Sequence, residues 1–397
     1  MLEGLKVVEL ATYIAAPAAG GIMADWGADV IKIESAAGDP MRRFLAGLAD
    51  SGQCDPTFEN DNRGKRAIVL DIGKPDGREA ALRLIREADI FLTNVRPAAL
   101  KRAGLDWDRL SVENPRLIYC SVTGYGLQGP DTDKPGFDIA SFWARTGMAS
   151  LTAPKGAEPF PIRTGMGDHT CALATLSAIL AAVIDRARTG KGRLVESSLL
   201  RAGAYAISSD MAIQLRLGRV ASTRARAHVV NPLANFFQAS DGRWLCILPR
   251  DGGSDWAAIA AAAGRASMAT DPRFASARER RANSAELVAM LDQAFAEMTL
   301  DEAGERLDGA DVVWAPVQTP AQLIADPQAE AAGCFVDIPG QAGEPSRAPA
   351  GPVRFPGADD GPKGPAPMLG QHTRTVLQEV GYSAAEVDAL IAAGAAA

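Results

Sequence analysis

Residues 165–176, with the sequence GMGDHTCALATL, place the carboxylate of Asp168 between glycines and a long apolar run. As an N-cap residue, Asp168 would accept hydrogen bonds from the first free amides of a helix, which contributes about 1 kcal/mol. As a nucleophile toward an activated acyl group it would use the same position. A helix N-terminus stabilises an anion, and Gly165 and Gly167 leave room for a substrate to approach. The neighbouring His169 is expected to be structural or orienting.

Several other catalytic and cofactor patterns are missing from the sequence. Glu34 ends the second expected strand where a ribose-binding acid could stand, but the segment ATYIAAP after the first strand carries no GxGxxG pattern. There is also no P-loop, HExxH or GxSxG motif. The three histidines and five scattered cysteines favour neither a metal cage nor a disulfide framework. We therefore expect reduced thiols, no metal and no permanently bound cofactor.

Basic residues recur after the early expected strands. A solvated charged face is one interpretation, and a site for a phosphate-rich ligand is the other, because open α/β sheets bind ligands at the carboxyl ends of their strands. The residues concerned are Arg42, Arg43, Arg63, Lys65, Arg66, Arg96, Lys101 and Arg102.

Composition limits the class of protein further. With 397 residues and 47% apolar content, the chain exceeds the ~250–300 residues at which single cores stop growing, so two domains are expected. The net charge of -7 argues against nucleic-acid and anionic-membrane partners. The first residues lack the features of a signal peptide, and the apolar run 171–184 is shorter than the ~20 residues of a membrane span. We expect no membrane association and a cytoplasmic location.

The elements that must position these residues follow from the apolar pattern. Strands are predicted at 5–10, 29–34, 66–72, 90–95 and 117–122, with helices at 17–26 and 77–89 between them, which indicates a parallel α/β sheet. A helix from Asp168 to about Arg188 is apolar nearly all round, so it must be buried in the protein or at a subunit contact. From about residue 225 a hairpin at 234–248 and alanine-rich helices predict a second, smaller domain.

Strings along nearly the whole chain resemble the class III CoA-transferase family, also called the CaiB/BaiF family. The strings are LKVVELATYIAAPAAG, ADWGADVIKIES with GDPMR, NRGKRAIVLD, LTNVRPAALKRAGLD, VTGYGLQGPDTDKPGFD, GMGDHTCALATLSAIL, DGRWLCIL and LGQHTRTVLQEVGYS. Each string is weak alone, but their common order makes the resemblance strong.

The resemblance implies a Rossmann-like parallel sheet in a large domain and a smaller α+β domain, in a ring-shaped subunit of an interlocked homodimer. The large domain would combine residues 1–200 with the returning segment 351–397. The small domain would span 225–325, and linkers at 201–224 and 326–350 would complete the ring.

The resemblance also implies a reaction in which Asp168 is the catalytic residue. The aspartate would attack an acyl-CoA thioester and pass through an acyl-aspartyl anhydride and an aspartyl-CoA thioester. CoA would thereby move to a free carboxylic acid acceptor. The loop along the thioester and pantetheine matches Tyr13, Ile14 and Ala15, and the nucleotide segments match Asn94, Val95, Arg96 and Arg102. Lys65, Tyr125 and Phe137 complete the expected CoA site.

Departures from the family pattern bear on the substrate. Ile14 stands where the formyl-CoA branch has glutamine, Ser35 stands where it has arginine, and PRDGGSDW around Gly252 and Gly253 replaces a longer glycine loop. These differences disfavour a formyl or oxalyl substrate.

Other branches of the family offer two alternatives. An α-methylacyl-CoA racemase uses the histidine of a GHD motif, but the corresponding triplet here is Gly136-Phe137-Asp138. Without that histidine a two-base mechanism loses one partner, so a racemase-like isomerase is only the second choice. A non-catalytic acyl-CoA binder is the other alternative. The strings look closest to the branch that moves CoA between 2-hydroxy or aryl acids, such as cinnamoyl-CoA:phenyllactate CoA-transferase. An apolar acid pocket with Ile14, Phe137 and Trp143 would suit those acids.

Overall fold

The computed structural model describes residues 1–45, 55–250, 254–340 and 345–397, so Cys54, Gly252 and Gly253 lie outside the described residues. By its internal contacts the chain divides into two compact units. The first comprises Met1–Ala149, Pro161–Gly218 and Gln328–Ala397, and the second comprises Ser150–Phe160 and Arg219–Pro327.

The first unit is built on a six-stranded sheet with the order β3-β2-β1-β4-β5-β6, in which all neighbouring strands are parallel. The predicted parallel α/β fold is confirmed. Central strands are buried on both faces, which explains why their sequences are nearly continuous apolar runs. The strands are β1 (Lys6–Leu10), β2 (Asp29–Glu34), β3 (Arg66–Val69), β4 (Ile90–Thr93), β5 (Ile118–Thr123) and β6 (Arg193–Ser198).

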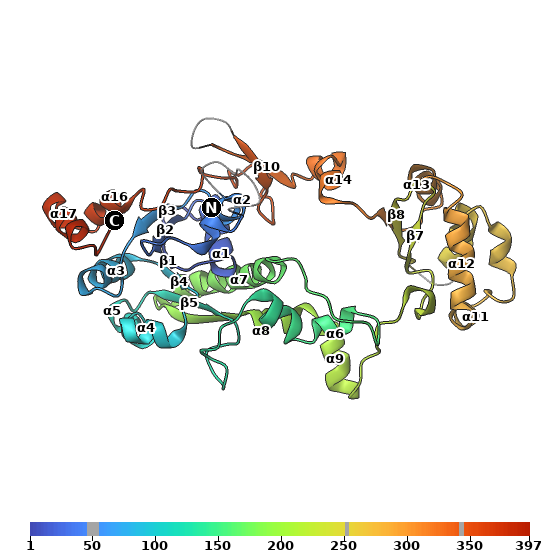
Figure 1. The fold of residues 1–397 in the computed structure, drawn as a ribbon, viewed down its shortest axis with the longest axis horizontal. Helices are drawn as coiled ribbons and strands as arrows, with labels where there is room; N and C mark the ends of the chain where they lie inside the picture. Colours follow the sequence, from blue (N-terminus) through green and yellow to red (C-terminus); the bar gives the residue numbers. More distant parts are fainter. Residues whose placement is uncertain (46–54, 251–253, 341–344) are drawn as a thin grey trace. The chain divides into compact units, whose positions relative to one another are not determined.

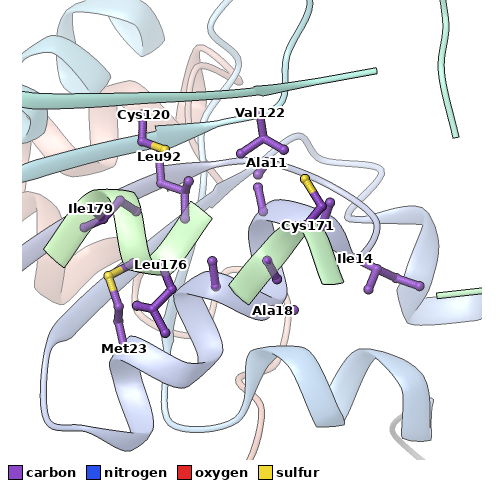
Figure 2. Packing of buried hydrophobic residues seen from close by; sticks show 14 of the residues in the cluster. Ala11, Ile14, Ala18, Met23, Leu92, Cys120, Val122, Cys171, Leu176 and Ile179 are labelled. Carbon is purple, nitrogen blue, oxygen red and sulfur yellow. The ribbon is translucent and has the colours of Figure 1, made fainter. Parts of the chain in front are cut away.

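One face of the sheet is covered by α1 (Ala15–Asp25) and α7 (Met166–Thr189), which lie against each other (Figure 1). Figure 2 shows Cys171, Leu176 and Ile179 of α7 packed among Ala18 and Met23 of α1 and side chains of the sheet. Also in this unit are η1 (Pro40–Arg43), α2 (Pro56–Asn62), η2 (Asp138–Ala144), α8 (Leu199–Ala206) and α9 (Ser208–Leu217). The division of the chain after Ala149 falls within α6 (Met148–Thr152).

The other face carries a second apolar cluster, which includes Leu84 of α3, Leu100 of α4, Leu110 of α5, Leu377 of α16 and Leu390 of α17. The C-terminal segment therefore returns to the sheet, and α16 contacts β3. The segment contains α16, and α17 follows it. The helices are α3 (Pro75–Glu87), α4 (Pro97–Ala103), α5 (Trp107–Glu113), α16 (Thr373–Glu379) and α17 (Ala384–Ala392).

The start of helix α7 differs from the sequence expectation. The helix begins at Met166 rather than at Asp168, because Gly165 has a φ of 94° and makes the turn into the helix. Its buried residues recur every three or four positions and form one stripe, whereas Leu173 and Ile184 on other faces are exposed in this chain. With 24 residues, α7 is long and apolar enough to cross a membrane by length and composition alone, a test that core helices of soluble proteins also pass.

The second unit has its own core, which contains Phe237, Leu245, Ile259, Leu287 and Phe295. The expected hairpin at 234–248 is formed by β7 (Asn235–Gln238) and β8 (Trp244–Ile247), and β9 (Trp314–Pro316) extends it into an antiparallel sheet. The helical elements are η3 (Arg226–His228), α10 (Ser254–Ala262), η4 (Ala266–Thr270), α11 (Ala277–Ala282), α12 (Ser284–Phe295), α13 (Leu300–Gly309) and α14 (Pro320–Ile324).

The segments expected as linkers contain regular structure. Residues 201–224 include most of α8 and all of α9, and residues 326–350 include α15 (Pro327–Ala331) and the antiparallel pair β10 (Phe335–Ile338) and β11 (Ser346–Pro349). Most of both segments groups with the first unit by contacts.

Candidate active site

A cavity of about 570 Å³ opens at the carboxyl ends of β1, β4 and β5, within the first unit. Its walls come from the loop after β1, the segment before η2 and the start of α7. This is the edge at which open α/β sheets bind ligands. Its lining includes Thr12, Tyr13, Ile14, Ala15, Asn94, Arg96, Lys134, Phe137, Asp138 and Asp168.

The loop after β1 is held in an uncommon backbone conformation by two side chains from elsewhere. Tyr13 has a φ of 64°, a region that residues other than glycine rarely adopt. Its N–H donates to Asp39 Oδ1 at 3.1 Å. Asn94 accepts from the N–H of Thr12 at 3.1 Å and donates to its carbonyl at 2.6 Å. The Tyr13 ring is thereby placed edge-on to Phe137, with ring centroids 5.1 Å apart.

Asp168 lies in the first turn of α7, in the wall of the cavity. The N-cap position is taken by Gly165, so the interpretation of Asp168 as the N-cap is wrong: the glycine at φ 94° starts the helix earlier. Glycine at 167 is required because a Cβ there would lie 2.7 Å from Phe142 Cγ and 2.9 Å from Asp138 Cβ. Among the described residues, no donor forms a hydrogen bond with the Asp168 carboxylate. The Asp168 carboxylate is therefore buried and accessible from the cavity, and it accepts no hydrogen bond from the described residues.

The surroundings of Asp168 raise the pKa of its carboxyl from 3.8 to about 7. Burial is the largest cause, because it removes water from the charged form. The charge of Asp138 acts in the same direction, and so does that of Asp61. The charge of His169 opposes them. At neutral pH the carboxyl is consequently divided between its protonated and ionised forms.

The ring of His169 contacts two acceptor groups, and its expected structural or orienting role stays a prediction. Its Nε2 lies 3.1 Å from Asp61 Oδ1 and its Nδ1 lies 2.9 Å from the carbonyl oxygen of Gly165. Both neighbours accept hydrogen bonds, so the protonated imidazolium, which donates from both ring nitrogens, is the form that satisfies both contacts. The hydrogen bond to Asp61 accordingly raises the pKa of His169 above its ordinary value.

The structure brings most of the expected CoA-binding residues to this edge of the sheet. Tyr13, Ile14, Ala15, Asn94, Arg96 and Phe137 line the cavity together with Asp168. Val95 lines a neighbouring cavity of about 520 Å³, which shares Thr12 with the first and lies beside the loops after β2 and β3. In this part of the first unit, loops that are far apart in sequence thus form two adjoining hollows.

Four other side chains named from the sequence are not among the lining residues. Lys65 is buried, and its ammonium donates to Glu9, to Asn62 and to the carbonyl of Pro17 at 2.8–2.9 Å. Arg102 is exposed on α4, and Trp143 is buried in the core cluster. Tyr125 lies under two cations, with Lys134 Nζ and Arg145 Cζ each 5.6 Å from its ring centroid.

The basic residues near the early strands divide into two groups. Arg42, Arg63, Lys65 and Arg66 form ion pairs with Glu34, Asp25, Glu9 and Asp29, respectively. Glu34, which ends β2, is thus the partner of a guanidinium. Arg96 lines the cavity, and Lys134 at its rim adds a second cation.

The model of CoA-transferase family III matches residues 2–373. The chain belongs to this family. It is therefore a CoA-transferase, and the resemblance inferred from the sequence strings is confirmed.

Two curated relatives match over nearly their whole lengths. A CoA-transferase of Clostridioides difficile named for (R)-2-hydroxy-4-methylpentanoate is 33% identical over 98% of this chain and 97% of its own length. Cinnamoyl-CoA:phenyllactate CoA-transferase of Clostridium sporogenes is 33% identical over 98% and 96%. The crystal structure of a CAIB/BAIF family protein from Brucella suis superposes with a TM-score of 0.85 at 32% identity and covers 96% of this chain and 99% of that one.

Two carboxylates of this CoA-transferase were missed as site residues by the reasoning from sequence. Asp39 holds the N–H of Tyr13, and Asp138 lines the cavity beside Asp168. The only signal for Asp138 was its place directly after Phe137. The described residues contain no group of three or more His, Cys, Asp or Glu side chains arranged to hold a metal ion.

Proposed function

We propose that this CoA-transferase acts by covalent catalysis with the Asp168 carboxylate as nucleophile. The observation that carries the proposal is the placement of Asp168: buried in the cavity wall, in the first turn of α7, and without a hydrogen-bond donor among the described residues. Asp138, the other carboxylate of the lining, has both oxygens engaged by backbone N–H groups. Of these two, Asp168 is therefore the one free to attack.

The reaction proceeds in carboxylate and thiolate exchanges. An Asp168 oxygen attacks the thioester carbonyl of acyl-CoA. The C–S bond breaks, CoA departs as a thiolate, and an acyl-aspartyl anhydride is formed. The thiolate then attacks the aspartyl carbonyl, which releases the first acid as a carboxylate and forms an aspartyl-CoA thioester. The acceptor carboxylate runs these two steps in reverse, departs as the new CoA ester and restores Asp168. Because both intermediates are hydrolysable, burial of the site supports transfer by excluding water.

The two adjoining cavities support a route for CoA along this edge of the sheet. We place the thioester and pantetheine against Tyr13, Ile14 and Ala15, and the nucleotide toward the second cavity, where Val95 lies. Arg96, in the wall of the first cavity, supplies a cation. Lys65, Arg102 and Tyr125 would contribute from outside the lining, by holding the neighbouring loops or meeting the part of CoA that extends beyond the cavities.

The acid is proposed to be apolar, in the 2-hydroxy or aryl class. Ile14, Phe44 and Phe137 give the cavity its apolar side, and Tyr13 adds an aromatic edge. The two relatives at 33% identity carry names with a branched 2-hydroxy acid and with cinnamoyl and phenyllactate groups. Screening acyl-CoA donors of these classes against free acids, with products read by mass spectrometry, identifies the pair with the highest kcat/KM.

The assembly is proposed to be an interlocked homodimer in the cytoplasm. The exposed apolar side chains Leu173 and Ile184 of α7, and Tyr205 and Leu215 of the following helices, offer surface for a second copy. The net charge of -7 supports a partner other than nucleic acid or an anionic membrane. Light scattering at decreasing concentration tests the dimer, since interlocked rings do not separate without unfolding; a monomer that retains full activity contradicts it.

The experiment that tests the mechanism compares wild-type protein with Asp168→Asn. Cinnamoyl-CoA alone should leave CoA on a peptide containing Asp168, and hydroxylamine should convert that residue to a hydroxamate detectable by mass spectrometry. Asp168→Asn should show neither product and should lose transferase activity, because an amide oxygen is a far poorer nucleophile. Asp185→Asn, at the other end of α7, is the matched control and should behave as wild type. A folded Asp168→Asn protein that exchanges CoA at the wild-type rate, with the amide verified by mass spectrometry, overturns the proposal.

A further inference from the structure

A second buried carboxylate contributes to the active-site wall from a different segment of the chain. Asp138 is the first residue of the π-helical segment η2 and is 2% exposed. Its Oδ2 accepts the N–H of Gly165 at 2.7 Å, across 27 residues of sequence. Its Oδ1 accepts the N–H of Ile139 at 2.8 Å. The side chain thus links η2 to the residue that starts α7.

The link fixes the direction of the first turn of α7. Gly165 is the N-cap, and its left-handed backbone leaves the N–H without a partner inside the helix. Its carbonyl accepts from the N–H of His169 at 2.8 Å and faces the His169 ring. Gly165, three positions before Asp168, thus forms hydrogen bonds through both its N–H, to Asp138, and its carbonyl, from His169.

Close packing beside the hydrogen bond leaves the turn little freedom. Gly167 lies so near η2 that a Cβ would come within 2.9 Å of Asp138 Cβ and within 2.7 Å of Phe142 Cγ. Gly167 directly precedes Asp168. The backbone on the N-terminal side of the nucleophile is thus held by a hydrogen bond at Gly165 and by contact at Gly167, both from η2.

We propose that Asp138 is a positioning residue for CoA transfer: it anchors the first turn of α7 through Gly165 so that Asp168 faces the thioester, and it places a negative charge beside the nucleophile. This role rests on the proposed function of Asp168. Nothing in it requires Asp138 to contact the reacting atoms, and its two oxygens stay bound to backbone N–H groups throughout.

The charge of Asp138 has a consequence separate from the hydrogen bond. The charged groups that face Asp168 are Asp138 from η2, Asp61 from α2 and His169 from α7 itself. Burial is the largest cause of the raised pKa of Asp168, and the charge of Asp138 is the second largest. Removing that charge lowers the pKa of Asp168, so the nucleophile stays ionised to lower pH. The resulting carboxylate is less basic and, on Brønsted grounds, less reactive once ionised.

Two substitutions separate the hydrogen bond from the charge. Asp138→Asn removes the charge but keeps one side-chain oxygen that can accept the Gly165 N–H, whereas Asp138→Ala removes both. The measurement is the pH profile of kcat and of kcat/KM between pH 5 and 9, with the donor and acceptor pair that ranks first in the screen, starting from cinnamoyl-CoA and phenyllactate. Asp185→Asn is again the control on α7 and should keep the wild-type profile.

In both Asp138 variants we expect the acid limb of kcat/KM to move to lower pH by about one unit, as for loss of a like charge at short range. Asp138→Ala should in addition lose about tenfold to a hundredfold in kcat at high pH with little change in the KM for acyl-CoA, because the nucleophile is no longer held in place. At high pH, Asp138→Asn should lose less kcat than Asp138→Ala. A residue that only stabilised the fold would lower the melting temperature and leave the acid limb where it is.

Either of two results overturns the proposal: an unmoved acid limb in Asp138→Asn, or an undiminished kcat in a folded Asp138→Ala protein. If Asp138→Ala fails to fold, the acid limb of Asp138→Asn decides alone. Failure of the proposed function is seen separately, because it would appear as activity in Asp168→Asn whatever the Asp138 variants do.

Discussion

Replacing Asp168 by Asn should make the folded protein more stable, and increasingly so as the pH rises. The physical reason is that the folded protein holds the carboxyl of Asp168 at a pKa of about 7, above its ordinary value of 3.8. Between these values the folded state binds more protons than the unfolded state, so the free energy of unfolding falls as the pH rises. The penalty is absent below pH 3.8 and complete above pH 7. An amide does not ionise and carries no such penalty.

The size of the effect follows from the interval between the two pKa values. About 3 pKa units correspond to about 4 kcal/mol once the carboxyl is fully ionised in both states. Part of this penalty is already present at pH 5, where an unfolded Asp is mostly ionised. Between pH 5 and pH 8 the stability of Asp168→Asn relative to wild type should therefore grow by about 3 kcal/mol. The favourable interaction of a carboxylate with the helix N-terminus, about 0.3–1 kcal/mol, is too small to reverse the sign.

The assay is urea unfolding of both proteins at matched concentration and at several pH values, with the difference in midpoint followed against pH. Because the two proteins differ at one residue, the contributions of the two units and of the oligomeric state to the free energy of unfolding cancel in the difference. Asp185→Asn on the same helix is the control: ion pairs with Arg193 and Arg188 lower the pKa of Asp185, so its titration lies below pH 5. Its stability difference should be flat from pH 5 to 8. A flat difference for Asp168→Asn as well would refute the raised pKa and the reasoning built on it.

Two further substitutions test the cavity. Arg96→Ala should raise the KM for acyl-CoA about tenfold with a smaller change in kcat, because a contact far from the thioester contributes mainly uniform binding, and Arg102→Ala, outside the lining, should give a smaller rise. Equal effects of the two substitutions on the KM, measured in initial-rate kinetics, would count against Arg96 as a cation that binds acyl-CoA in the cavity. Gly167→Ala should destabilise the protein by about 1–3 kcal/mol, because its Cβ meets the Phe142 ring at 2.7 Å; an unchanged melting temperature would contradict this.

The sheet was predictable because its signal is local. Each of the five early strands is a short apolar run, and the helices between them force parallel connections, so alternation alone indicates the architecture. The start of α7 was not predictable to the residue. Asp168 is of the type preferred at an N-cap, and only the backbone angle of Gly165 reveals that the helix has begun two residues earlier.

The roles of the charged residues depended on partners remote in sequence. The sequence offered two interpretations of the basic residues, a solvated charged face and a phosphate-binding site, and neither predicted their ion pairs. Arg63 pairs with Asp25, 38 residues away, and Lys65 pairs with Glu9, 56 residues away. Such pairing cannot be derived from the spacing of the basic residues, since the carboxylates come from α1 and β1. Arg96, three residues after the end of β4, lines the cavity at the carboxyl ends of the strands, and its contact with a ligand stays a prediction.

The ionisation of Asp168 shows how two demands on the site conflict. The proposed transfer through an anhydride and a thioester requires that the nucleophile be shielded from water. The same shielding raises the pKa of the Asp168 carboxyl, which would have to ionise for this reaction. The helix N-terminus and His169 favour the ionised form, whereas Asp138 and Asp61 oppose it. The balance lies near neutrality: at a pKa of about 7, a rise from pH 6 to pH 8 increases the ionised fraction about tenfold. A site built in this way keeps a basic, reactive carboxylate that is still available at neutral pH, and its rate should depend on pH over the range in which an ordinary aspartate is fully ionised.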